Sequence, residues 1–140
     1  MRLHELKQRN YFELFPGILF KGYGNEESIY IDDESFSFIT PAIQKGFESY
    51  RVFERFEIGK SQWHSIIKEL LNLREIIDRK DRIRLKAYIS TFFWQESVLE
   101  WKLEEYEKID VLKLMRFIED LIEWIESQLE DNDVITLIGL

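Results

Sequence analysis

Two long stretches of the chain carry apolar residues at helical spacing. Residues 63–77 place six apolar side chains on one face, and Ser61 stands where a helix cap is expected. Residues 111–129 are apolar at every third or fourth position, with charged residues between them and Asp110 at the cap position. Both stretches predict amphipathic helices that pack one face on a core.

The N-terminal part of the chain predicts shorter elements. Residues 1–15 predict a short helix ended by Pro16-Gly17, and residues 18–27 predict a loop. Residues 28–31 predict a strand that stops at Asp32-Asp33, with Asp33 as the cap of the following helix.

Apolar residues at helical spacing follow up to residue 47, and Pro41 interrupts them. Either Thr40 caps a new helix there or the helix kinks.

Three further segments complete the expected elements. Residues 50–58 predict a strand ended by Gly59, and residues 134–138 predict a terminal strand buried on both faces. Residues 82–107 are ambiguous, because residues 82–89 alternate as a strand pair would, whereas apolar residues up to Tyr106 share one helical face. Helix formers dominate the second half of this segment, so a helix is favoured.

The expected elements indicate an α+β, mainly α, fold: a bundle of about four helices with a small sheet of short strands. The length of 140 residues fits one domain spanning 1–140. The chain has no cysteine, which excludes a disulfide scaffold and thiolate metal sites. Its first residues are polar and it has no run of about 18 apolar residues, so a cytoplasmic protein without a membrane partner is expected.

Negative charge is concentrated near the C-terminus. Residues 96–133 hold thirteen acidic and four basic residues, a net charge of −9. Because the whole chain has a net charge of −8, the rest of the chain has a net charge of +1. Such a field repels nucleic acid and attracts basic partners. The basic residues of segment 74–86 are expected to offset part of this charge within the fold or to form a solvated face.

Candidate residues for catalysis, metal binding or nucleotide binding are scarce. The two histidines, His4 and His64, have no second ligand at a metal-binding spacing. The acidic groups at 32–34 and 131–133 fit turns and helix caps better than a calcium loop. Gly22-Tyr23-Gly24 is followed by acids that would repel a phosphate. We therefore expect no catalytic activity, no cofactor and no metal.

Three sequence features together resemble small bacterial immunity proteins of polymorphic or contact-dependent toxin systems. They are Asp33-Glu34-Ser35-Phe36 and Ser61-Gln62-Trp63 at helix starts, and the ending from Leu121-Ile122-Glu123-Trp124-Ile125 through Val134 to Leu140. The features span most of the chain and point to no specific family within that group. The resemblance implies a stoichiometric inhibitor of a toxin domain, with no catalytic residues of its own.

Two functions remain open on this evidence. The first is a cytoplasmic inhibitor whose acidic helical surface occludes the active site of a basic toxin domain, through the following residues: Glu119, Glu123, Glu126 and Glu130, with Glu100 and Glu104 behind them. The second is a regulatory or adaptor domain that binds another protein, or itself, through exposed aromatic residues. Core packing is the expected role of Trp94, Trp101 and Trp124, and any that are exposed would be interface anchors. The sequence leaves the oligomeric state open.

Overall fold

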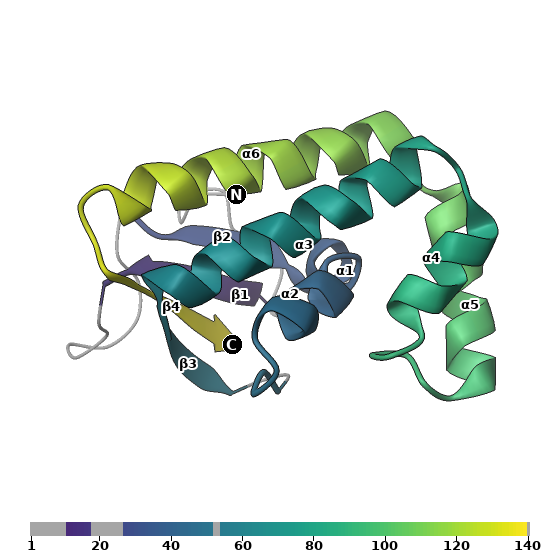
Figure 1. The fold of residues 1–140 in the computed structure, drawn as a ribbon, viewed down its shortest axis with the longest axis horizontal. Coiled ribbons are helices and arrows are strands. Elements are labelled where there is room, and N and C mark those ends of the chain that lie inside the picture. Colours follow the sequence, from purple (N-terminus) through teal and green to yellow (C-terminus); the bar gives the residue numbers. More distant parts are fainter. Residues whose placement is uncertain (1–10, 18–26, 52–53, 140) are drawn as a thin grey trace.

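The computed structural model describes residues 11–17, 27–51 and 54–139, and in these ranges the chain forms six helices and one four-stranded sheet (Figure 1). In chain order the elements are β1 (Tyr11–Pro16), β2 (Ile29–Asp32), α1 (Asp33–Ser37), α2 (Thr40–Gly46), β3 (Arg55–Gly59), α3 (Lys60–Asp78), α4 (Arg82–Ile89), α5 (Glu96–Lys108), α6 (Val111–Leu129) and β4 (Val134–Gly139). The predicted class, α+β and mainly α, is confirmed.

The sheet is antiparallel throughout and has the strand order β2-β1-β4-β3. Leu14 of β1 lies opposite Ile29 of β2 on one side and Leu137 of β4 on the other, and all three belong to the core. The strand at the end of the chain therefore occupies a central position in the sheet. Its four middle residues are buried, as the composition of residues 134–138 predicted.

Helices α3 and α6 lie side by side over the sheet and extend beyond it (Figure 1). All six apolar residues predicted for the inner face of α3 are buried, and the Trp63 indole N–H donates to the Ile135 carbonyl of β4 at 3.1 Å. Helix α6 buries residues Leu114, Ile118, Leu121, Ile122, Ile125 and Leu129. The Asp110 carboxylate accepts from the Leu112 and Lys113 N–H groups, which confirms the predicted cap.

Helix α2 packs directly on α3 through a glycine. A Cβ added to Gly46 would lie 2.5 Å from the Ile66 Cα, so no side chain fits between the two helices at this point. The helical pattern that leads to this contact is divided near Pro41 into two short helices, α1 and α2. Asp32 caps α1 by accepting from the Ser35 N–H at 3.0 Å, so the predicted cap was one residue too late. Ile39, and not Thr40, is the residue before α2.

The helix predicted for residues 1–15 is wrong over residues 11–15, which belong to strand β1. Four consecutive residues of β1 are buried, so the strand lacks the alternation that marks a strand with one solvated face. Residues 1–10 of that prediction, and residues 18–26 of the predicted loop, lie outside the described residues. Gly17 ends β1 with a φ of 91°, a conformation that favours glycine.

Two boundaries near residue 59 differ from the predicted ones. Strand β3 begins at Arg55 and not at residue 50. Helix α3 begins at Lys60 with Gly59 as its cap residue, and the Gln62 side chain accepts from the Gly59 N–H at 3.2 Å. Ser61 therefore lies inside the helix and does not cap it.

Most of residues 82–107 are helical, but they form two antiparallel helices joined by a turn at residues 90–95 and not one helix. Asp81 caps α4 by accepting from the Arg84 N–H, and the Ile89 carbonyl accepts from the N–H groups of Phe92 and Phe93 where α4 ends. The rings of Phe92 and Phe93 pack against the core at the turn, with their centroids 4.9 Å apart. The α4–α5 hairpin lies at the end of α3 and α6 that is farther from the sheet (Figure 1).

Candidate protein-interaction surfaces

Four predicted partner-binding residues lie in one stripe along α6. Because an α-helix turns about 100° per residue, Glu119, Glu123, Glu126 and Glu130 fall within an arc of about 60°. Glu130 follows directly after the last residue of the helix, and all four residues are exposed. The buried residues of α6 occupy a separate arc, centred about 120° around the helix from the stripe, so core packing leaves these glutamates in solvent.

Three of the four stripe residues have no partner within the described ranges. Glu119 contacts Arg74 of α3 in an ion pair and a 2.7 Å hydrogen bond. Glu123, Glu126 and Glu130 make no ion pair or side-chain hydrogen bond with any described residue. The stripe therefore starts with a neutralised glutamate and continues with three free carboxylates.

The Arg74 contact also fixes the direction of the stripe. Since Glu119 reaches Arg74, the stripe runs along the side of α6 that faces α3. Leu71 precedes Arg74 by three residues on α3 and so shares its side of that helix, and its side chain is exposed. An apolar contact point thus accompanies the carboxylates.

Acidic residues beyond the predicted set extend the negative surface. Asp120 is exposed on α6, and Asp131 and Asp133 are exposed after its end. Like the free stripe residues, these three make no side-chain hydrogen bond or ion pair in the described part of the chain. The helical periodicity could have identified Asp120, whereas Asp131 and Asp133 fall beyond the helix that periodicity defines.

The two predicted residues on α5 are not part of this stripe. Glu100 contacts Lys86 of α4 at 2.9 Å and Arg82 of α4 at 3.1 Å, and these cations lower its pKa, with the Lys86 hydrogen bond as the main cause. The Glu100 and Glu96 carboxylates in turn raise the pKa of Lys86. Glu104 is exposed and has no partner among the described residues. The structure thus brings together four of the six predicted residues.

The basic segment 74–86 offsets acidic charge within the fold, one of the two roles expected of it. Arg74, Arg82 and Lys86 all contact acidic residues of the C-terminal third. Arg82 also contacts Glu107, and Arg79 contacts Glu75 within α3 at 3.1 Å.

The α4–α5 hairpin exposes large apolar residues. The exposed fraction is 75% for Trp94, 58% for Trp101 and 84% for Ile83. Val98 and Trp101 are three residues apart and so lie on one side of α5, and Trp94 lies in the turn just before the helix. Core packing, the expected role of the tryptophans, is therefore wrong for Trp94 and Trp101. Trp124 is half-buried against the core.

Lys102 and Tyr106 anchor the hairpin to the rest of the chain. The buried Lys102 ammonium donates to the Ser37 hydroxyl at 2.5 Å and to Glu105 at 3.1 Å, and it lies 3.9 Å from the centre of the Phe38 ring. Burial lowers the pKa of Lys102, and the Glu105 carboxylate partly opposes this shift. The Tyr106 hydroxyl donates to the Phe38 carbonyl at 2.5 Å. The helical pattern included Tyr106, but no sequence pattern indicated Lys102 or the contacts with Ser37 and Phe38, because those contacts are long-range.

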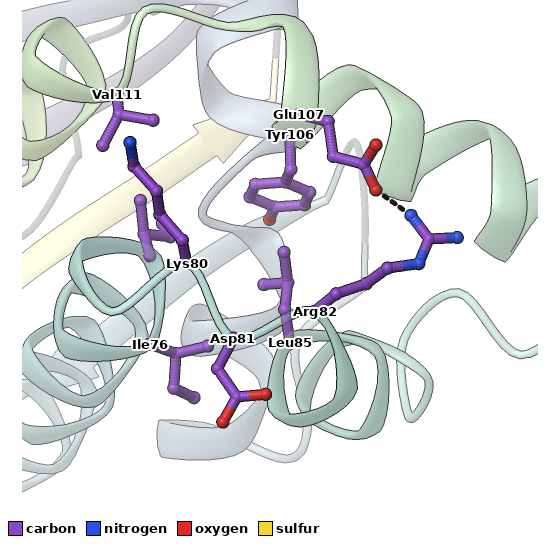
Figure 2. A pocket seen from close by; sticks show the side chains of 9 residues that line it. Ile76, Lys80, Asp81, Arg82, Leu85, Tyr106, Glu107 and Val111 are labelled. Atoms are coloured by element: carbon purple, nitrogen blue, oxygen red, sulfur yellow. Dashed lines mark ion pairs between the residues drawn. The ribbon is translucent and has the colours of Figure 1, made fainter.

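A pocket of about 240 Å³ lies where α3, α4, α5 and α6 meet (Figure 2). Its wall is mainly apolar, formed by Ile76, Ile77, Leu85, Tyr106 and Val111. The Arg82–Glu107 ion pair stands at one side, and the Lys80 amino group extends toward Val111. The two charges of the ion pair neutralise one another, so the pocket offers mainly an apolar surface.

The remaining sequence candidates have structural surroundings of their own. His64 is exposed on α3, Asp32 caps α1, and Gly22-Tyr23-Gly24 lies outside the described residues. Among the residues that the structure describes, no group of three or more His, Cys, Asp or Glu side chains is arranged to hold a metal ion. None of the helices in that part of the chain has the length and apolarity that crossing a membrane requires.

Comparison with protein-family models, with curated proteins and with solved structures finds no match to this chain. Its function is therefore inferred from its own residues.

Proposed function

We propose that this chain is a cytoplasmic immunity protein that binds a basic bacterial toxin domain and occludes its active site with the α6 stripe. The supporting observation is the group of free carboxylates on Glu123, Glu126 and Glu130, which core packing holds on one side of α6. An anionic helix of this kind occupies the place of an anionic substrate in a basic active site. The proposed inhibitor acts by binding alone.

The charge distribution supports fast capture of such a partner. Opposite charges steer association toward rates of about 10⁸–10⁹ M⁻¹s⁻¹ at low salt. The chain has a net charge of −8, and the exposed Asp120, Asp131 and Asp133 add to the field around the stripe. Leu71 supplies an apolar contact beside the charges, and burial of this side chain against the partner adds to the binding free energy.

The proposal is tested by association kinetics with the partner that co-purifies from the native cell. In the double variant Glu123→Gln, Glu126→Gln, the association rate should fall about 3–10-fold at low salt, and its dependence on salt should weaken. The matched control is Glu48→Gln, Glu54→Gln, which removes two exposed acids between α2 and β3. Equal rates for the two double variants would contradict the proposed surface.

A second candidate function is favoured by the exposed tryptophans. An adaptor domain would use Trp94 and Trp101 as aromatic anchors for another protein, since such residues dominate binding energy at interfaces. The variant Trp94→Ala, Trp101→Ala distinguishes the two functions in the same assay. Loss of binding in this variant, together with wild-type kinetics in the stripe variant, would favour the adaptor.

A further inference from the structure

Strand β3 forms one edge of the sheet, and its inner side pairs with β4. The Gly139 N–H donates to the Glu54 carbonyl at 3.4 Å, and the Lys60 N–H donates to the Asp133 carbonyl at 2.9 Å. In an antiparallel pair the backbone groups of alternate residues point to the same side. The even-numbered residues from 54 to 60 therefore point toward β4, and the backbone groups of Arg55, Glu57 and Gly59 point away from it.

The outward edge of β3 is open at two residues. The Gly59 N–H is already bonded to the Gln62 side chain at 3.2 Å. Arg55 and Glu57 are exposed, and their N–H and C=O groups have no hydrogen-bond partner on the outward side within the described ranges. An open edge of this kind is a template for another strand.

The sequence Arg55-Phe56-Glu57 is complementary to itself in one register. If a second copy pairs antiparallel with β3 and Phe56 lies on the two-fold axis, Arg55 lies opposite Glu57 of the second copy, and Glu57 lies opposite its Arg55. Each of these opposed pairs is then a hydrogen-bonded pair, because both residues point outward. Opposite charges facing each other across strands are stabilising.

Shifting this register in either direction brings like charges together. A shift that keeps the backbone groups matched places either Arg55 opposite Arg55 or Glu57 opposite Glu57, and such pairs are destabilising. Phe56 is half-buried on the core side, with its ring 5.3 Å from Phe47 and 5.8 Å from Tyr50. In the centred register the two Phe56 residues form the close, non-hydrogen-bonded pair.

We propose that two copies of this chain associate edge to edge along β3, in the antiparallel register centred on Phe56. The two sheets join into one continuous sheet across a two-fold axis, with two Arg55–Glu57 ion pairs between the copies. The contact is short, so the dimer is weak and depends on protein concentration. It uses neither the α6 stripe nor the tryptophans of the hairpin, and it stands or fails separately from the proposed function.

Charge exchange at the two positions tests the proposal by analytical ultracentrifugation. Arg55→Glu leaves two acids on the edge and Glu57→Arg leaves two bases, so each variant alone should dimerise at least about tenfold more weakly than the wild type. An equimolar mixture of the two variants should form the heterodimer. The variant Arg55→Glu, Glu57→Arg restores opposite charges in the same register and should dimerise as the wild type does.

Two matched variants control for the change in net charge. Arg84→Glu on α4 and Glu104→Arg on α5 change exposed residues away from β3, and they should leave dimerisation unchanged. Circular dichroism of every variant verifies that each one folds. A monomeric wild type at the highest attainable concentration, or a mixture that forms no heterodimer, would overturn the proposal.

Amide hydrogen exchange locates the contact independently of mutation. The Arg55 and Glu57 amides should exchange more slowly as protein concentration rises, because they donate across the dimer. A dimer in which these two amides continue to exchange at the monomer rate would use another surface and would refute edge pairing.

Discussion

Helices α5 and α6 both carry many acidic residues, but the fold uses them in opposite ways. On α5, the carboxylates of Glu96, Glu100, Glu105 and Glu107 all contact a lysine or arginine. On α6, only Glu119 does so among the four acids of the helix, within the part of the chain described. Both helices bury an apolar face, but each also exposes an apolar side chain, Trp101 on α5 and Leu112 near the start of α6.

The difference comes from the element that packs beside each helix. Helix α5 lies against α4, which presents Arg82 and Lys86 along their shared edge. Helix α6 lies against α3, which presents Arg74 to the first acid of the stripe. A count of acidic residues along the sequence therefore overstates the field that a partner meets. The field depends on which cations the neighbouring helix brings into reach.

Mutation of the inner face of α6 is expected to have the largest effect. Ile118→Ala removes a fully buried side chain and should lower the free energy of unfolding by about 2–5 kcal/mol, measured by urea denaturation. Trp101→Ala, on the exposed side of α5, should change it by less than about 0.5 kcal/mol. A similar cost for both variants would mean that the α5 tryptophan also packs in a core.

The anchoring of α5 is tested by Tyr106→Phe. The variant leaves the Phe38 carbonyl without its donor and should cost about 1–3 kcal/mol at neutral pH. Burial raises the pKa of Tyr106, and burial together with the Glu69 carboxylate raises the pKa of Tyr88.

A raised folded-state pKa has a definite consequence for alkaline stability. Tyrosine contributes its full stabilisation below its unfolded pKa of about 10, and this is lost as pH rises from there toward the folded value. Tyr106→Phe should therefore lose less stability than the wild type between neutral and alkaline pH. Tyrosinate absorbance and circular dichroism, followed together, measure this difference. Tyr106 ionisation without unfolding would contradict its burial.

The smallest expected effect is the difference in Tm between variants of a paired and of an unpaired glutamate. Glu100→Gln should lower Tm, because it breaks contacts with Arg82 and Lys86, and the loss should shrink in high salt. Glu123→Gln should leave Tm unchanged or raise it slightly, since it removes one negative charge from a crowded face. Calorimetry of both variants at two salt concentrations makes the comparison. An equal loss of Tm would show that Glu123 has a partner.

Sequence patterns predicted the elements whose residues have a single burial direction. Helix α6 has a continuous apolar face, and Asp110 marks its start, so the helix and its outward glutamates could both be predicted from the sequence. Strand β1 could not, because Tyr11 to Leu14 are buried on both faces and show no period of two. The turn between α4 and α5 contains no glycine or proline, and tertiary packing of Phe92 and Phe93 accompanies it.

The ion pairs explain why only part of the candidate surface could be predicted. Glu100 and Glu104 are both acidic residues of α5, but Glu100 is paired because it shares a helical edge with Glu96, which faces Lys86. Whether that edge lies beside a basic helix depends on how α4 and α5 pack together in the hairpin. The open edge of β3 likewise depends on strand order, which the sequence of residues 55–59 does not contain.

Gly46 has a consequence for the opposite end of the molecule. The helix that it seats against Ile66 directly follows the segment containing Ser37 and Phe38, which receive the bonds from Lys102 and Tyr106. A single methyl group at position 46 would displace that helix, and the hairpin would lose its alignment although none of its own residues had changed. The positions of the two exposed tryptophans thus depend on Gly46 having no side chain, although Gly46 lies in a different helix.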